Sequence, residues 1–185
     1  TLFRSGKVAV EDAVLKLKEA PFEDLGFAKI DSHRALRQGV AEVIYGAGKT
    51  PEQILEIAQA MLSKGQKSIL ITRMSEGAAK FVNQKICLHY DPISKIGVIG
   101  EIPEADGVGT IVVASGGTSD MPVAQEAALT AEVLGNRVTR LYDVGVAGLH
   151  RLLAHIDGIM SARVIIAVAG MEGALASVIG GLADS

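Results

Sequence analysis

The most regular hydrophobic pattern lies in the second half of the chain, where three short apolar runs alternate with helical segments. The runs are Ile111–Ala114, Val138–Leu141 and Val164–Val168, and they begin about 27 residues apart. Each is followed by a glycine-containing turn and a helical pattern, of which the clearest apolar stripe is Leu149, Leu152, Leu153 and Ile156. This spacing is typical of βα units, and nearly continuous apolar strands indicate a parallel sheet covered on both faces. The pattern predicts a Rossmann-like three-layer domain.

A capped helix is the best-signalled element of the first half of the chain. Thr50 is placed to cap it, Pro51 occupies its first position and Gln53 completes a capping box. Gly65 is expected to end it. Its apolar face consists of Ile54, Ile57, Ala58, Met61 and Leu62. Strands are expected over residues 27–31, 42–45, 68–72 and 95–99, helices over 8–18 and 75–83, and an extended segment over 85–90.

The change of pattern predicts two domains. The segment Ala105-Asp106-Gly107 separates the irregular first half from the regular βα units. We therefore expect an N-terminal α/β domain over residues 1–105 and a nucleotide-binding domain over residues 106–185. The expected fold class is α/β.

Composition excludes several classes of protein. The 185 residues include 18 Lys and Arg against 21 Asp and Glu, whereas nucleic-acid-binding domains usually carry a basic excess. No apolar run approaches the roughly 18 residues that a membrane span needs. No positively charged stretch followed by an apolar one opens the sequence, so we expect no secretory signal. The single cysteine, Cys87, cannot form an internal disulfide. We expect a soluble cytoplasmic protein that binds neither nucleic acid nor membrane.

The turns after the three predicted strands indicate a ligand site. In parallel α/β sheets, ligands bind beyond the carboxyl ends of the strands, where glycines allow close approach and helix N-termini present free N–H groups. Thr118 and Ser119 add hydroxyls, and Arg151 adds a cation whose planar fork suits phosphate or carboxylate. The pattern favours a pocket for a phosphorylated, nucleotide-like molecule. The candidate binding residues are Gly117, Thr118, Ser119, Asp120, Gly148, His150, Arg151, Gly170, Met171, Glu172 and Gly173.

A purely structural interpretation of the same turns stays open. In it Ser119 only caps a helix, Pro122 is a first-turn proline and the glycines are ordinary turn residues. The basic cluster His33, Arg34, Arg37 and Lys49 is also open: it binds a second phosphate, pairs with another subunit, or forms a solvated basic face, which the spacing alone favours.

Three side chains in these turns are candidates for catalysis. His150 follows a strand-end turn closely, and imidazole exchanges protons near neutral pH. Asp120 and Glu172 are candidates for contact with a metal ion or a hydrolytic water. No tightly bound cofactor is expected, and magnesium is the metal left open.

Motifs in the second half resemble a known family of turns. Gly117–Pro122 is similar to the Gly-Ser-x-Ser-Asp-x-Pro nucleotide turn of the aminoimidazole ribonucleotide carboxylase and carboxyaminoimidazole ribonucleotide mutase family. Gly148–Arg151 resembles its Ser-Ala-His-Arg turn, and Ala169–Leu175 its Ala-Gly-x-x-x-x-Leu turn. The order and spacing of the three turns also agree.

The details resemble the LarB family more closely than the purine enzymes. Val144–Arg151 and Gly170–Leu175 are similar to LarB turns, as is Gly26–Arg37 with its pattern Gly-Phe-Ala-x-x-Asp-x-His-Arg-x-x-Arg. The resemblance implies the first step of nickel-pincer nucleotide synthesis, for the cofactor of lactate racemase. That step carboxylates the pyridinium ring of nicotinic acid adenine dinucleotide with CO2 or bicarbonate, and hydrolyses the phosphoanhydride to release AMP.

The resemblance also implies a cysteine nucleophile, and here the sequence departs from the family. A thiolate adds to the ring, which then attacks CO2, and proton loss with thiolate expulsion restores the aromatic ring. The family's cysteine lies downstream of a further strand, beyond Ser185, so we expect a catalytic domain truncated at its C-terminus. Cys87 does not match it, and we expect it to be buried in Ile86-Cys87-Leu88 and a poor nucleophile. The 185-residue chain alone is expected to be inactive.

Relatives with this type of sheet form homo-oligomers, so subunit contacts are also expected. Two alternatives stay open. One is a purine-pathway aminoimidazole ribonucleotide carboxylase or mutase, although those enzymes lack a comparable N-terminal domain. The other is a non-catalytic nucleotide-binding module.

Overall fold

The computed structural model describes residues 22–31, 34 and 39–183. The helix expected over residues 8–18 lies outside the described residues. None of the helices in the described part has the length and hydrophobicity needed to span a membrane.

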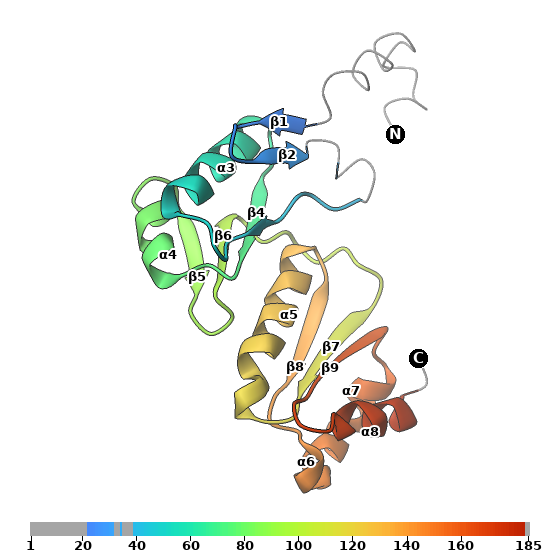
Figure 1. Cartoon of the computed structure of the whole chain (residues 1–185). Coiled ribbons are helices and arrows are strands. Elements are labelled where there is room, and N and C mark those ends of the chain that lie inside the picture. The colour runs from blue at the N-terminus through green and yellow to red at the C-terminus, as the bar shows by residue number, and fades with distance from the viewer. Residues whose placement is uncertain (1–21, 32–33, 35–38, 184–185) are drawn as a thin grey trace, which may run out of the picture.

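The first half of the chain builds two small sheets (Figure 1). Strands β1 (Phe22–Asp24) and β2 (Lys29–Asp31) form an antiparallel pair. The second sheet has the order β3-β4-β6-β5, in which β3 and β4 are parallel and the other pairs antiparallel. Its strands are β3 (Ile44–Tyr45), β4 (Ser68–Thr72), β5 (Leu88–Asp91) and β6 (Ile96–Gly100). The sequence predicted these strands within a few residues, whereas β1 was not predicted.

Helices α3 (Pro51–Ser63) and α4 (Glu76–Asn83) cover one face of the four-stranded sheet. The capping box of α3 is confirmed, because Thr50 Oγ1 accepts from Gln53 N at 3.3 Å and Gln53 Oε1 accepts from Thr50 N at 3.1 Å. Gly65, at a φ of +84°, follows the end of the helix as predicted.

The second half forms an all-parallel sheet with the order β8-β7-β9. The strands are β7 (Thr110–Ser115), β8 (Arg137–Leu141) and β9 (Val164–Val168). The helices are α5 (Met121–Val133), α6 (Leu149–Leu153), α7 (Ile156–Met160) and α8 (Ala174–Leu182), with short 3₁₀ turns η1 (Thr118–Asp120) and η2 (Val146–Gly148). The predicted α/β class with a Rossmann-like layer is confirmed.

Successive side chains of β7 point to opposite faces of the sheet and so belong to two separate core clusters. Val113 packs toward α5, whereas Val112 and Ala114 pack toward α6, α7 and α8. Helices therefore cover both faces of the sheet (Figure 1). The predicted single stripe is wrong in one respect, because the helix breaks between α6 and α7. Leu152 is fully buried there, but Leu149 and Leu153 are 41% and 43% exposed.

Helix α5 packs against both sheets. On one side Ala124 and Ala128 contact the β7 sheet, and on the other Leu129 and Val133 pack on a cluster of the four-stranded sheet made of Leu70, Ile96 and Val98. The segment 101–109, between β6 and β7, contains neither helix nor strand. The predicted division at residue 105 falls there, and the independence of two domains stays a prediction.

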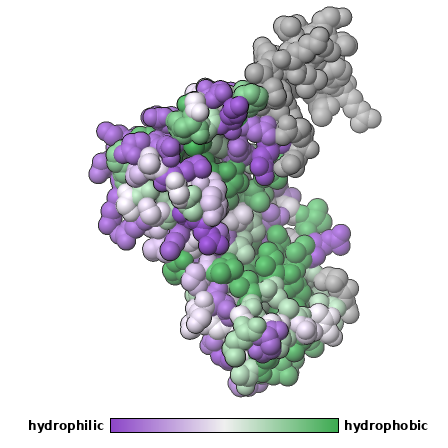
Figure 2. Space-filling view, viewed as in Figure 1, coloured by the Kyte–Doolittle hydropathy of each residue, from purple (hydrophilic) through white to green (hydrophobic). Residues whose placement is uncertain are grey.

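Hydrophobic side chains also reach the surface of the second unit. Figure 2 shows them gathered where Figure 1 draws β9, an edge strand whose Val164 is 48% exposed. The visible face of the first unit is mainly hydrophilic (Figure 2).

Candidate functional site

The three strand-end turns meet at the carboxyl edge of the parallel sheet. Strands β7 and β9 are neighbours, yet the turn after β7 leads to α5 on one face and the turn after β9 leads to α8 on the other. This reversal is the topological switch point at which doubly wound sheets bind ligands. The predicted turns therefore lie at the expected place.

Asp120 joins the turn after β7 to the turn after β9. Its Oδ2 accepts from Gly117 N at 2.9 Å, and its Oδ1 accepts from Gly170 N at 3.2 Å. Gly116 N donates to Val168 O at 3.0 Å and closes the same junction. Because Asp120 uses both oxygens on backbone groups, its first role in this structure is to hold the two turns together.

Ser115 joins the turn after β7 to the turn after β8. Its side chain is fully buried, its Oγ accepts from Asp143 N at 3.3 Å, and its carbonyl accepts from Val144 N at 2.9 Å. Gly145 lies directly against Gly116, since a Cβ at Gly145 would collide with the carbonyl oxygen of Gly116. Glycine at this position lets the two turns touch.

Arg151 is held at the site by an ion pair. Its Nη1 donates to Asp143 Oδ2 at 2.7 Å, and both side chains are partly exposed. A Cβ at Gly148 would lie 2.8 Å from Arg151 Nε, so glycine there makes room for the guanidinium. The guanidinium of Arg151 has five N–H donors, of which Asp143 accepts one. The planar arrangement of the other N–H groups suits an anion such as phosphate.

The remaining predicted residues are exposed on these turns. They are Thr118 and Ser119 after β7, His150 in the first turn of α6, and Met171 and Glu172 after β9. Two non-glycine residues of the turns adopt positive φ, Asp143 at +58° and Met171 at +55°, beside Gly173 at +70°. Such strain in a turn is typical of functional sites.

The structural interpretation of Ser119 is wrong, because Asp120 rather than Ser119 occupies the N-cap position of α5. Pro122 does lie in the first turn of α5, as that interpretation required. Helix α6 has only five residues, so the anion binding by free N–H groups that was expected at its N-terminus is weak.

The structure corrects the expectation for Cys87. Its thiol is exposed, just before β5, so the burial that was expected is absent. It lies in the first half of the chain, next to the four-stranded sheet and not to the sheet that carries the three turns. Of the basic cluster, His33 and Arg37 lie outside the described residues, and a joint role with Arg34 and Lys49 stays a prediction.

Metal binding stays a prediction as well. Among residues 22–31, 34 and 39–183, no group of three or more His, Cys, Asp and Glu side chains could hold a metal ion. Magnesium at Asp120 and Glu172 would therefore need ligands from a substrate or from outside these residues.

Two residues of the site were missed as site residues by sequence reasoning. Ser115 and Asp143 join the turns and hold Arg151, although neither carries a recognisable motif. For Ser115, the available signal was a polar residue directly after the apolar run Ile111–Ala114. The pairing of Asp143 with Arg151 depends on the path of the turn, which spacing alone does not give.

Comparison with known proteins supports the family assignment. Residues 22–101 match a family model described as "LarB/PurE-like N-terminal domain". An uncharacterized protein of Methanocaldococcus jannaschii is 32% identical over 191 residues, which span 98% of this chain and 75% of that protein. The domain match indicates an enzyme of the carboxylase or mutase type. The likeness of the C-terminal turns to purine carboxylases lies outside the matched residues and stays a prediction. With this relative and this domain, the chain belongs to the LarB family.

Proposed function

We propose that this protein carboxylates the pyridinium ring of nicotinic acid adenine dinucleotide and hydrolyses its phosphoanhydride to release AMP, as the first step of nickel-pincer nucleotide synthesis. The observation that carries the proposal is the junction of three strand-end turns by Asp120 and Ser115 at the switch point of the sheet. It occurs in a chain of a carboxylase- or mutase-type family.

The turns supply groups that suit the phosphate of a mononucleotide. Thr118 and Ser119 present exposed hydroxyls, and Arg151 presents a guanidinium oriented by Asp143. A hydrogen bond to a charged group contributes about 1.5–3 kcal/mol, which corresponds to roughly 10- to 150-fold in affinity. In this proposal Arg151 carries the largest single share of phosphate binding.

Carboxylation needs a nucleophilic ring carbon, whereas a pyridinium ring is electrophilic. In the reaction that the LarB resemblance implies, the thiolate of a cysteine other than Cys87 adds to the ring and gives a neutral dihydropyridine, whose ring carbon forms a bond to CO2. Loss of the ring proton and expulsion of the thiolate then restore the pyridinium. His150 and Glu172, exposed on two of the turns, are the candidates to accept that proton or one from the hydrolytic water. Cys87 is not proposed as the nucleophile, because it lies before β5 on the other sheet.

The first test measures, by calorimetry, how tightly the 185-residue chain binds nicotinic acid adenine dinucleotide. Arg151→Ala should weaken binding by about 10- to 150-fold. Arg163→Ala is the matched control, because Arg163 is exposed just before β9, at the opposite end of the sheet. Equal affinity of the wild type and the Arg151 variant would refute the assignment.

The second test is turnover by the protein translated from the complete gene, with ¹³C-bicarbonate and the dinucleotide. We expect label in the mononucleotide product, AMP in equal amount, a changed pH profile in His150→Asn and little effect of Cys87→Ser. Turnover of aminoimidazole ribonucleotide instead would favour the purine-pathway alternative, and binding without turnover would favour a non-catalytic module. A substrate adduct on Cys87 would show that the nucleophile has been misplaced.

A further inference from the structure

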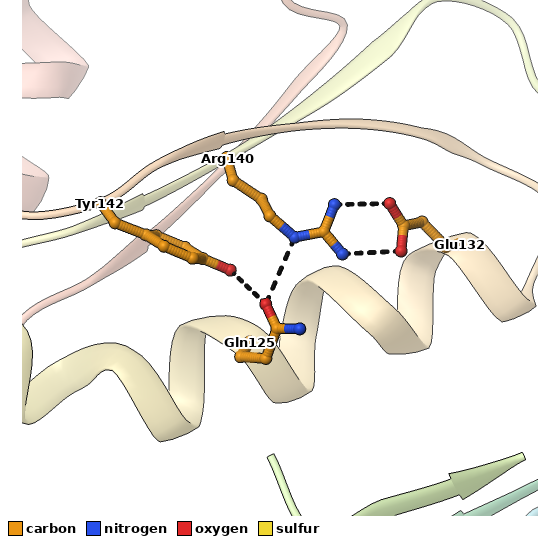
Figure 3. A network of polar contacts seen from close by, with 4 residues as sticks. All are labelled: Gln125, Glu132, Arg140 and Tyr142. Atoms are coloured by element: carbon orange, nitrogen blue, oxygen red, sulfur yellow. Dashed lines mark hydrogen bonds and ion pairs between the residues drawn. The ribbon is translucent and has the colours of Figure 1, made fainter. Parts of the chain in front are cut away.

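A polar network joins α5 to β8 and to Tyr142, the residue that follows this strand (Figure 3). Arg140 on β8 donates from Nη1 and Nη2 to the two carboxylate oxygens of Glu132, at 2.6 and 2.7 Å. Its Nε donates to Gln125 Oε1 at 3.3 Å, and Tyr142 Oη donates to the same oxygen at 2.8 Å. One amide oxygen on α5 therefore accepts from two residues at the end of β8.

The helix that carries Gln125 also packs on the four-stranded sheet, where its Leu129 and Val133 join a cluster with residues of β4 and β6. At the end of β5, Asp91 is fixed within its own turn, since its Oδ2 accepts from Ser94 Oγ at 2.6 Å and from Ser94 N at 3.3 Å. Partial burial acts to raise the pKa of Asp91, but these hydrogen bonds outweigh it and lower the pKa.

Tyr142 connects this network to the turn that holds Arg151. Burial raises the pKa of Tyr142, and although Arg140 acts in the opposite direction the hydroxyl stays protonated, as a donor to Gln125 must. The next residue is Asp143, at a φ of +58°, whose N–H donates to Ser115 and whose carboxylate holds Arg151. A displacement of Tyr142 would therefore move the anchor of Arg151 by way of the adjoining peptide.

A second bridge to α5 starts from the same sheet. Arg73, which follows β4 at a φ of +53°, donates from Nε to Glu126 Oε1 at 3.2 Å. Glu126 is adjacent to Gln125 on α5, so the end of β4 holds the middle of this helix. The N-terminal half of the chain thus contacts the helix that follows Asp120.

We propose that Gln125 is a positioning residue, through which the four-stranded sheet fixes the Asp143 turn and the orientation of Arg151. In this role the N-terminal unit sets the geometry of a site that lies wholly in the second half. The ligand-binding test of this inference rests on the proposed function, whereas the hydrogen-exchange test needs no ligand.

The ligand-free test is amide hydrogen exchange in Gln125→Met, which keeps the length of the side chain and removes its polar groups. Exchange at the Val144 amide, bonded to Ser115 O, should become about 3- to 10-fold faster, the range for loss of a single net hydrogen bond. Exchange at Val113, in the middle of β7, should not change. Tyr142→Phe, a milder variant, should give a smaller effect at Val144, and Gln84→Met, exposed after α4, none.

An unchanged rate at Val144 in both network variants would overturn the inference. So would equal acceleration at Val144 and Val113, because that result means general destabilisation rather than a local effect on the turn.

The ligand test is a double-mutant cycle with nicotinic acid mononucleotide as the titrant. Gln125→Met should weaken binding by about 3- to 10-fold in the wild-type background and by less than about twofold in Arg151→Ala. Equal weakening in both backgrounds would show that Gln125 does not act through Arg151. If the wild type fails to bind while Val144 exchange still responds to Gln125, the proposed function fails and the positioning role stands.

Discussion

Asp120→Asn is the sharpest probe of how the turns are joined. The carboxylate accepts two backbone N–H bonds, at 2.9 Å from Gly117 and 3.2 Å from Gly170. An asparagine keeps one acceptor oxygen and places an NH2 group against the other N–H, so one bond is lost and one donor is left unpaired. A hydrogen bond to a charged group contributes about 1.5–3 kcal/mol, and with partial exposure of Asp120 we expect a loss of about 1–2 kcal/mol.

Urea unfolding followed by circular dichroism measures this loss. For a chain of this length it corresponds to a fall in Tm of roughly 2–8 °C. The amide resonances of Gly117 and Gly170 should shift, because each loses or changes its acceptor. The control is Asp157→Asn, an exposed aspartate in the first turn of α7, for which we expect a few tenths of a kcal/mol at most. Unshifted amides together with wild-type stability would refute the role of Asp120.

Three further predictions concern packing, close contact and pH. Gly145→Ala should destabilise the chain by about 2 kcal/mol or more because its methyl group meets Gly116 O, whereas Gly158→Ala, with open space around it in α7, should be neutral or stabilising; chemical denaturation of the pair checks this. Leu129→Ala should cost about 2–4 kcal/mol by leaving a cavity between α5 and the four-stranded sheet, measured as a lower urea midpoint with an unchanged slope. The pKa of Asp91 is lowered from 3.8, so its stabilising contribution is complete above that value and is lost as the pH falls below it. Between pH 6 and pH 3, the free energy of unfolding should therefore fall less steeply in Asp91→Asn than in the wild type. Identical slopes for the two proteins would contradict this role of Asp91.

Elements with strong local signals could be predicted from the sequence. The cap of α3 at Thr50 and its end at Gly65 depend on neighbouring residues alone, which is why both were correct. The three parallel strands were also predictable, because each is a short apolar run at βα spacing. Strand β1, three residues long, has no such signal and was missed.

Features that depend on tertiary contact could not be predicted. The break between α6 and α7, which leaves Leu149 and Leu153 partly exposed, follows no residue that ends helices strongly. Burial of Cys87 was inferred from its apolar neighbours, but position just before a strand leaves its side chain exposed. The alternation of strands and helices predicted that the three turns lie at one edge of the sheet. It did not predict the hydrogen bonds of Asp120 and Ser115 that join the turns, because these depend on the path of each turn in space.

Helix α5 has a consequence for how this protein changes over evolutionary time. Leu129 and Val133 face one sheet while Ala124 and Ala128 face the other, so a substitution in the helix must satisfy two packed surfaces at once. Separating the two halves would expose the apolar cluster that Leu129 and Val133 form with Leu70, Ile96 and Val98. Across relatives, residues of α5 should therefore covary with both sheets, and the gene should be inherited with its two halves together.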